Sequence, residues 1–298
     1  MDRSGWRTMT IALALVASLC VLRPAGAAAP SSPEELAKIE AAVPAKATVK
    51  PARPRTLLLF NRGKGNVHTA IPYGAKAIEL MGKKTGAFDV VHSTDPAVFQ
   101  ADRLKRFDAI CFNNSNRMDF FKDPALQRSV IDFVKSGKGL VGVHAATTNF
   151  LAKYALDWPE GAEMLGGIFD GHPWHEKVTI RLDEPDHPLN AAFGGKGFEI
   201  VDEIYQFTGP YSRRKLRVLL SIDTAKTNMK KGKAIRRTDN DFAVSWVRRY
   251  GKGRVFYCSL GHDHHVFWNA AVLRHYLDGI QFALGDLKAE AAPSDPGK

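Results

Sequence analysis

The chain has 298 residues, of which 45% are hydrophobic, 24% are charged and 10% are aromatic. These proportions are ordinary for a globular protein, and they exclude a disordered chain, a collagen-like chain and a polytopic membrane protein. The net charge of +11 is partly local, because residues 213–237 hold ten basic residues and a single acidic one, Asp223. That segment lacks the interleaved aromatic side chains on which single-stranded nucleic acids stack, so we expect a solvated loop and no nucleic-acid partner.

The N-terminus predicts a secretory signal peptide over residues 1–27. Arg3 and Arg7 precede an apolar run at 11–22, and residues 25–27 form a small-x-small cleavage site. The apolar run is too short for an ordinary spanning helix, which needs about 20 residues. We therefore expect a periplasmic or secreted protein. The alternative is an uncleaved N-terminal anchor, which would be the chain's only link to a membrane.

The rest of the chain divides into three parts by composition. Residues 28–54 are rich in Ala, Pro and Lys and carry no strand pattern, which predicts a linker. Residues 55–285 alternate between apolar runs and amphipathic stretches, which predicts one folded domain. Residues 286–298 are again linker-like and are expected to form a tail.

Within the domain, the only cysteines are Cys111 and Cys258, and both sit in short apolar runs. Cysteines in such runs are usually buried thiols of the core. An exported chain permits a disulfide between them but does not require one.

Apolar runs that alternate with helical patterns predict an α/β fold. In the first half, strands are expected at 56–60, 88–92, 107–112 and 139–143, and helices at 70–81 and 124–135. Strands separated by helices indicate a parallel sheet with helices on its faces. In the second half, strands are expected at 177–182, 203–207, 217–222, 242–247 and 254–259, before a last helix at 269–284. The short turns between several of these strands predict antiparallel additions to the sheet.

The candidate site lies at the carboxyl ends of the strands, because ligands of open α/β sheets bind there. Of ten histidines, seven fall in four loops that follow or connect predicted strands: His68, His144, His172, His175, His262, His264 and His265. His144 comes directly after the strand at 139–143, where a sharp turn is expected to hold its side chain exposed at the top of the sheet. The other three, His92, His187 and His275, are interpreted as packing or surface residues.

Three chemistries use such a cluster. Imidazoles transfer protons near neutral pH. They also bind transition metals, with carboxylates such as Glu203 and Asp263 as further ligands or as orienting groups. Finally, they form hydrogen bonds with a polyol.

Residues 172–176 combine features of a metal site and of a sugar site. The spacing of His172 and His175, followed by Glu176, is compatible with a divalent metal, zinc or manganese. Trp174 and the nearby Tyr205 would suit stacking on the face of a sugar ring. Neither pattern is a specific signature.

Four motifs, in this order, resemble the ThuA-like (trehalose utilisation) family over about residues 55–284. They lie at 141–147, 166–173, 202–205 and 250–263. The family's fold resembles that of class I glutamine amidotransferases, so the resemblance implies a flavodoxin-like, mostly parallel sheet. Those enzymes carry a nucleophilic Cys at the turn where this chain has His144. A glutamine amidotransferase is therefore excluded.

The resemblance also implies a role in disaccharide and glycoside catabolism, often beside dehydrogenases that oxidise the sugar C3 hydroxyl. We therefore expect a small-molecule sugar substrate, such as a 3-keto glycoside, and a glycoside-cleaving lyase or hydrolase. A 3-keto group acidifies the C2 proton, so a base can remove it while the C1 group leaves. Candidate catalytic residues are His144 or His68 as the base, and Glu203 or one of the pair His172 and His175 as the acid. A metal, or a protonated histidine such as His262, would stabilise the developing oxyanion.

Candidate substrate-binding residues are His172, Trp174, Tyr205 and Asp263. Two other functions stay open: a carbohydrate-binding protein without turnover, and a metal-dependent hydrolase. The sequence also leaves a homo-oligomer open.

Overall fold

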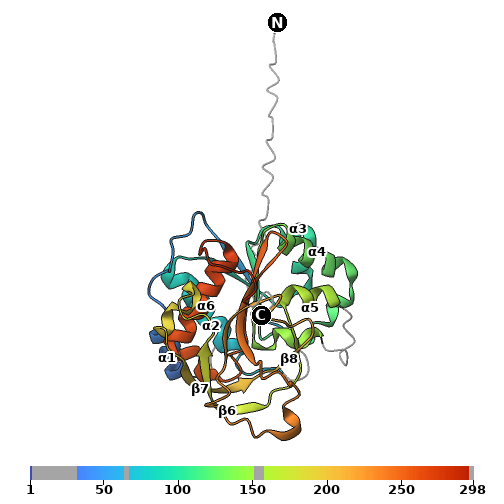
Figure 1. Ribbon diagram of the computed structural model, residues 1–298. Coiled ribbons are helices and arrows are strands. Elements are labelled where there is room, and N and C mark those ends of the chain that lie inside the picture. Colours follow the sequence, from blue (N-terminus) through green and yellow to red (C-terminus); the bar gives the residue numbers. More distant parts are fainter. Residues whose placement is uncertain (2–31, 64–66, 151–157, 295–298) are drawn as a thin grey trace.

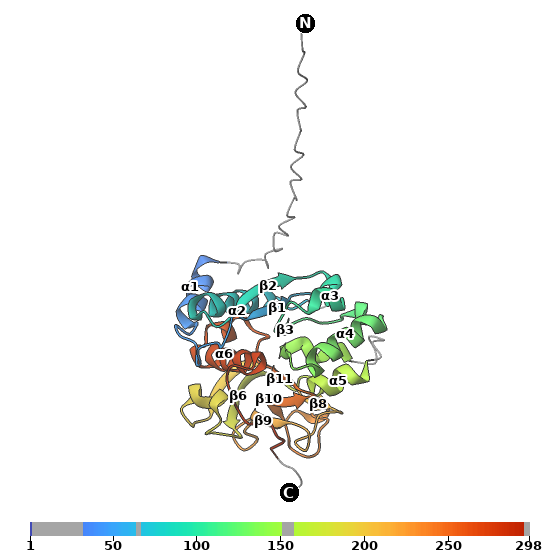
Figure 2. The ribbon, with the colours of Figure 1, turned by 90° about the horizontal axis from the view of Figure 1, so that it is seen from above.

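The protein is described here by a computed structural model that covers residues 1, 32–63, 67–150 and 158–294. The predicted signal peptide lies outside the described residues, apart from Met1. Three layers are visible when the ribbon is seen from above (Figure 2), with a central sheet between two sets of helices. Helices α1 (Pro33–Ala42), α2 (Ile71–Thr85) and α6 (Ala270–Leu284) cover one face, and α3 (Ala101–Leu104), α4 (Pro124–Lys135) and α5 (Pro159–Leu165) cover the other. Among the helices described, none has the length and apolar character needed to cross a bilayer.

The central sheet has nine strands in the order β2-β1-β3-β4-β11-β10-β9-β6-β7. Their bounds are β1 Thr56–Phe60, β2 Asp89–Ser93, β3 Ala109–Asn113, β4 Gly139–Val143, β6 Trp174–Leu182, β7 Phe198–Ile204, β9 Arg217–Ile222, β10 Ala243–Tyr250 and β11 Gly253–Cys258. The first five in this order pair in parallel, and the remaining pairings are antiparallel. Strands β5 (Ile168–Phe169) and β8 (Phe207–Thr208) form a separate small sheet.

This topology confirms the predicted α/β fold, with a flavodoxin-like parallel part and antiparallel additions. If β11 is counted as the fifth parallel strand, the parallel part has the flavodoxin order 2-1-3-4-5. Strands of this part read as continuous apolar runs because helices cover both of their faces. Helix α4 shows how closely local signals fix an element: the side chain of Asp123 caps it, Pro124 occupies its first turn and it ends before Gly137.

Two apolar cores lie on the two faces of the sheet. Cys111 and Cys258 are both buried with free thiols, as predicted. Burial raises the pKa of the Cys258 thiol to about 12, so it is not an activated nucleophile.

The predicted linker and tail are wrong over their described parts, which pack against the domain. In α1, Ile39 is fully buried, and Val43 after it is 4% exposed. Arg55 and Asp286 form a salt bridge of 2.5 Å, and Leu287 is buried as well. The domain therefore includes residues 33–54 and 286–294, which carry too few apolar residues for their burial to be predicted.

The antiparallel strands return to the edge where the parallel strands end. Each of the pairings from β11 to β10, β9, β6 and β7 reverses direction, so β7 runs in the same direction as β11. The carboxyl end of β7 and the start of β6 therefore face the same way as the carboxyl ends of the parallel strands. Strand β6 pairs with β9 only over residues 180–182, so the first half of the β6–β7 hairpin is free of that strand. In Figure 1 the hairpin lies at the lower end of the view.

Candidate functional site

Three histidines from distant parts of the chain meet at this edge. His68 lies between β1 and α2, His144 directly follows β4, and His262 lies shortly after β11. The ring centroid of His68 lies 5.0 Å from that of His144 and 5.3 Å from that of His262. The centroids of His144 and His262 are 5.4 Å apart. The predicted meeting of these loops is present in the structure.

Glu203, on β7, faces the histidines as the shared carboxylate. One carboxylate oxygen, Oε2, lies 3.4 Å from His144 Nε2. The other, Oε1, lies 3.3 Å from His172 Nδ1 and 3.8 Å from His262 Nε2. Glu203 reaches this position because β7 runs parallel to β11 and ends at the same edge.

In His144 and His262, the hydrogen bond that Nδ1 makes fixes which ring nitrogen faces Glu203. Nδ1 of His144 lies 2.6 Å from the carbonyl oxygen of Ser259, so this nitrogen carries the hydrogen and donates it. Nδ1 of His262 lies 2.9 Å from a carboxylate oxygen of Asp263 and donates in the same way. In their neutral forms both rings therefore direct an Nε2 lone pair towards the site.

His144 lies behind Glu203 rather than on the surface. Its side chain is fully buried, and it does not line the hollow described below. Its backbone φ is 41°, a left-handed conformation that non-glycine residues seldom adopt and that is common at functional turns. The prediction that the turn would expose this side chain is wrong, because Glu203 on β7 and Tyr205 just after that strand pack against the ring.

Burial and neighbouring charges shift the pKa of the two central groups. Burial, helped by the nearby His144 and His262, lowers the pKa of His68 to about 3. Burial acts to raise the pKa of Glu203, but the imidazoles of His144, His262 and His172 beside it outweigh burial and hold the pKa at about 2. A carboxylate with so low a pKa is ionised at neutral pH, which disfavours the predicted role of Glu203 as proton donor.

Two buried polar side chains that sequence reasoning missed hold the loops together. Asp202 accepts backbone N–H groups of Gly261 at 2.7 Å and of Asp263 at 2.9 Å. Asn114 donates to the carbonyl oxygen of Gly261 at 2.9 Å. The run of polar residues at 113–116, directly after β3, was a usable signal, since it too lies at the carboxyl edge.

The histidines open onto a hollow of about 390 Å³, within the usual range for small-molecule sites of roughly 300–1,000 Å³. Its lining residues are Val67, His68, Thr69, Asn116, Arg117, Thr148, Phe169, His172, Glu203, Tyr205 and His262. Tyr205 forms part of its wall, with its ring 4.1 Å from that of His144 and 4.4 Å from that of Phe169. Most of the lining residues carry polar side chains, which suits hydrogen bonding to a polyol.

Trp174 is wrong as a substrate-binding residue. Its side chain is fully buried, its Nε1 donates to the carbonyl oxygen of Asn228 at 2.9 Å, and its ring packs edge-on against Phe242. Tyr205 is only 2% exposed, so it offers an edge rather than an open stacking face. Trp174 begins a strand, and its alternating side chain points into the core.

The predicted metal ligands do not converge. His172 faces Glu203, His175 lies 3.1 Å from Asp263, and Glu176 pairs with Lys231 at 2.6 Å. His175 and Glu176 are consecutive in β6, so their side chains point to opposite faces of the strand.

Two other groups do have ligand atoms close together, within 4.8 Å of one another: His68, His144 and Glu203, and His175, His262 and Asp263. The first group is largely enclosed, whereas the second lies at the rim of the hollow. Candidate ligands for a metal therefore exist, although not in the predicted combination.

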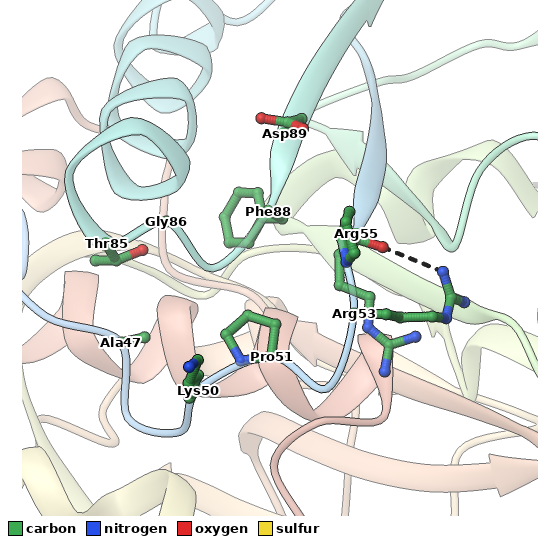
Figure 3. A pocket seen from close by; sticks show the side chains of 10 residues that line it. Ala47, Lys50, Pro51, Arg53, Arg55, Thr85, Gly86, Phe88 and Asp89 are labelled. Carbon is green, nitrogen blue, oxygen red and sulfur yellow. Dashed lines mark hydrogen bonds between the residues drawn. The ribbon is translucent and has the colours of Figure 1, made fainter.

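A larger hollow, of about 600 Å³, lies at the opposite end of the strands. It includes Arg55, just before β1, and Asp89, the first residue of β2 (Figure 3). Its arginines are engaged in structural pairs, since Arg53 binds Asp108 and Arg55 binds Asp286. Without a cluster of reactive groups among its lining residues, it is a weaker candidate than the smaller hollow.

The basic segment 213–237 is a set of paired surface groups rather than a uniform patch. Arg213 bonds to both Asp183 and Asp241, and Arg236 bonds to Asp170. Its charge is therefore partly neutralised by acidic residues from elsewhere in the chain.

Comparison with known families identifies the chain. Residues 56–283 match the ThuA family, which is described as trehalose utilisation. The chain belongs to the ThuA family. This membership points to a role connected with sugars. Among proteins with curated descriptions, none matches this chain.

Solved structures agree with the ThuA fold. A ThuA-like protein of Bacteroides uniformis has a TM-score of 0.62 at 20% identity, and the match covers 78% of this chain and 93% of that one. A ThuA-like protein of Parabacteroides merdae has a TM-score of 0.54 at 16% identity, covering 80% of this chain and 93% of that one. At these identities the likeness concerns the fold alone.

Proposed function

We propose that this ThuA-family protein is an exported, sugar-processing enzyme that cleaves 3-keto glycosides or disaccharides by histidine-based proton transfer. The observation that carries the proposal is the gathering of His68, His262 and His172 with Glu203 around one polar hollow of about 390 Å³. Four groups able to exchange protons or to bind hydroxyls in so small a volume suit a substrate that is both polyhydroxylated and labile to proton removal.

The reaction is a β-elimination. The C2–H and C1–O bonds break, a C1=C2 double bond forms, and the leaving oxygen receives a proton. His262 is the base, because Asp263 holds its Nδ1 and so directs the Nε2 lone pair towards the hollow. His172 is the acid, since it lies at the mouth with half of its side chain exposed and can exchange protons with water.

Two members of the cluster support these groups. Glu203 is a carboxylate that touches both His172 and His262 and so orients the acid and the base. His144, which lies behind Glu203, is a positioning residue. This assignment replaces the predicted role of His144 as the base, because the buried ring cannot reach a substrate.

A metal-dependent hydrolase that uses zinc or manganese is the second candidate, favoured by the closely spaced ligand atoms of His68, His144 and Glu203. Elimination and hydrolysis differ at C2. In D₂O, elimination with reversible proton removal brings deuterium into C2, whereas direct hydrolysis leaves C2 unlabelled.

The deciding experiment is incubation of the protein with a 3-keto glucoside that bears a chromogenic aglycone. We expect release of the aglycone, and a fall in turnover of about 10²–10⁴ for His262→Ala, the range for loss of a general base. His265→Ala is the matched control. His265 lies on the same loop and contacts the carbonyl oxygen of Val201 outside the hollow, so its loss should leave turnover unchanged. Binding of the glucoside without any product would instead identify a carbohydrate-binding protein.

A further inference from the structure

The contacts around Glu203 are electrostatically incomplete. Its carboxylate only accepts hydrogen bonds, and in their neutral forms His144 and His262 present lone pairs to it because their Nδ1 atoms donate elsewhere. Acceptors that face one another in a buried place repel unless something positive lies between them. Either a proton or a cation is needed to complete the arrangement.

Two buried nitrogens of the cluster have no hydrogen-bond partner within the part of the chain that the structure describes. They are Nε2 of His144 and Nδ1 of His68. A fully buried imidazole nitrogen without a partner is costly, and such an atom in a native protein calls for a reason. His144 Nε2 is directed at the carboxylate, where a hydrogen bond of good geometry is not formed.

We propose that His68, His144 and Glu203 form a binding site for one first-row divalent cation. The inference rests on, and deepens, the proposed sugar chemistry by adding a Lewis acid to the same hollow. The three ligand atoms already lie within 4.8 Å of one another. Around a tetrahedral zinc ion with bonds of about 2.0–2.1 Å, ligand atoms are roughly 3.3 Å apart, so small side-chain rotations bring them to bonding distance.

The ligand set indicates the type of cation and of site. Two imidazoles and one carboxylate suit zinc, manganese or iron better than magnesium or calcium, which prefer oxygen ligands only. Three protein ligands leave at least one coordination position open, as in catalytic rather than structural sites. Because His68 and Glu203 also line the hollow, that position faces the space where a carbonyl or hydroxyl oxygen of the substrate would lie.

The surrounding contacts have the form of a second coordination layer. The Ser259 carbonyl oxygen accepts the Nδ1–H of His144, which is the usual way in which a metal-binding histidine is oriented. Removal of such an outer partner alone costs 10–100-fold in metal affinity. Loss of a direct ligand is therefore expected to cost more.

The test is metal binding by the full-length protein, stripped with a chelator and then titrated with Zn²⁺ or Mn²⁺. We expect one equivalent per chain by elemental analysis and calorimetry. The isosteric Glu203→Gln and the loop variant His68→Ala should bind at least about 100-fold more weakly. His175→Ala, which removes a ligand from the rim group only, is the control and should bind within a few-fold of the parent. Circular dichroism and thermal unfolding check that each variant is folded.

Three outcomes would contradict the proposed metal site. Absence of stoichiometric binding, unchanged affinity in folded Glu203→Gln, or loss of binding in His175→Ala alone would overturn the inference. A second readout is the visible spectrum of bound Co²⁺, which should be altered or lost in His68→Ala. The inference and the proposed function fail separately. If the metal-free protein still cleaves 3-keto glycosides, the cation does not act as a Lewis acid in the reaction. If the cation binds tightly at these ligands but no glycoside is cleaved, the proposed sugar chemistry is wrong.

Discussion

Ser259 supplies only a carbonyl oxygen to the site, yet that oxygen decides which nitrogen of His144 faces Glu203. A histidine has two chemically different nitrogens, and the partner of one fixes the role of the other. Asp263 does the same for His262. The hydrogen-bond roles of His144 and His262 therefore depend on the Ser259 carbonyl oxygen and the Asp263 carboxylate as well as on the imidazole rings. Sequence reasoning found the rings but not Ser259, because a backbone carbonyl carries no signal in the sequence.

Asp202 gives a direct test of this support. Its two oxygens each accept one backbone N–H of the loop that carries His262. In Asp202→Asn the side-chain amide must face one of these N–H groups. We expect a loss of about 1–3 kcal/mol in the free energy of unfolding, because a buried donor is left unpaired. Turnover of the keto glucoside should fall by about 10²-fold, the effect of a catalytic group displaced by about 1 Å.

The control for Asp202→Asn is Glu199→Gln on the same strand. Glu199 pairs with Lys177 at 3.1 Å, and both side chains are more than half exposed. Such surface pairs contribute about 0–1 kcal/mol. Urea unfolding of the two variants compares them directly, and equal losses would show that Asp202 has no special role.

Elements were predicted well where their signal is local. Strands β1, β4 and β9 and helix α4 have the predicted bounds, since buried parallel strands read as apolar runs and α4 has clear end signals. The arrangement of the β6–β7 hairpin could not be predicted, because strand pairing is decided by contacts distant in sequence. The error over Trp174, His175 and Glu176 has the same origin: once these residues are in a strand, their side chains alternate.

The packing of helix α1 against the core could not be predicted from the sequence. Its first turn is fixed by Ser32, which caps it, and Pro33, but its only fully buried side chain is Ile39. We expect Ile39→Ala to lower the free energy of unfolding by about 2–4 kcal/mol, because it leaves a cavity in the core.

Glu40→Ala, at the neighbouring exposed position of the same helix, should change that free energy by less than about 0.5 kcal/mol. Chemical denaturation measures both variants. If Ile39→Ala unfolds at the urea concentration of the parent protein, residues 33–54 do not belong to the folded domain.

The stability of the whole molecule should depend on pH through groups buried away from the site. His275, on α6, is fully buried between the Ser245 hydroxyl and the Leu189 carbonyl oxygen, and burial lowers its pKa from 6.5 to about 4. Above pH 6.5 the ring is neutral in both states and has no effect. As pH falls towards 4, the unfolded chain gains a proton that the folded one does not, so about 3 kcal/mol of stability is lost.

Asp278, on the same helix, acts in the opposite direction. Burial raises the pKa of its carboxyl group from 3.8 to about 6, so the folded state is disfavoured above that range and recovers stability as pH falls from 6 to 3.8. We expect Asp278→Asn to remove this compensation and to lose stability more steeply than the parent protein between pH 6 and 4. Urea unfolding across that range measures the slopes, and a variant with a slope no steeper than the parent's would contradict the assignment.

The position of β11 in the sheet determines how much of the chain is needed to form the candidate site. This strand is the last one along the described residues, yet it is inserted between β4 and β10 and joins the parallel and antiparallel parts of the sheet. Without β11, the parallel and antiparallel parts of the sheet are not paired with each other, and the loop that carries His262 is not held beside His68. A fragment that ends before residue 253 lacks both β11 and His262, so it cannot form the hollow at the carboxyl edge of the sheet.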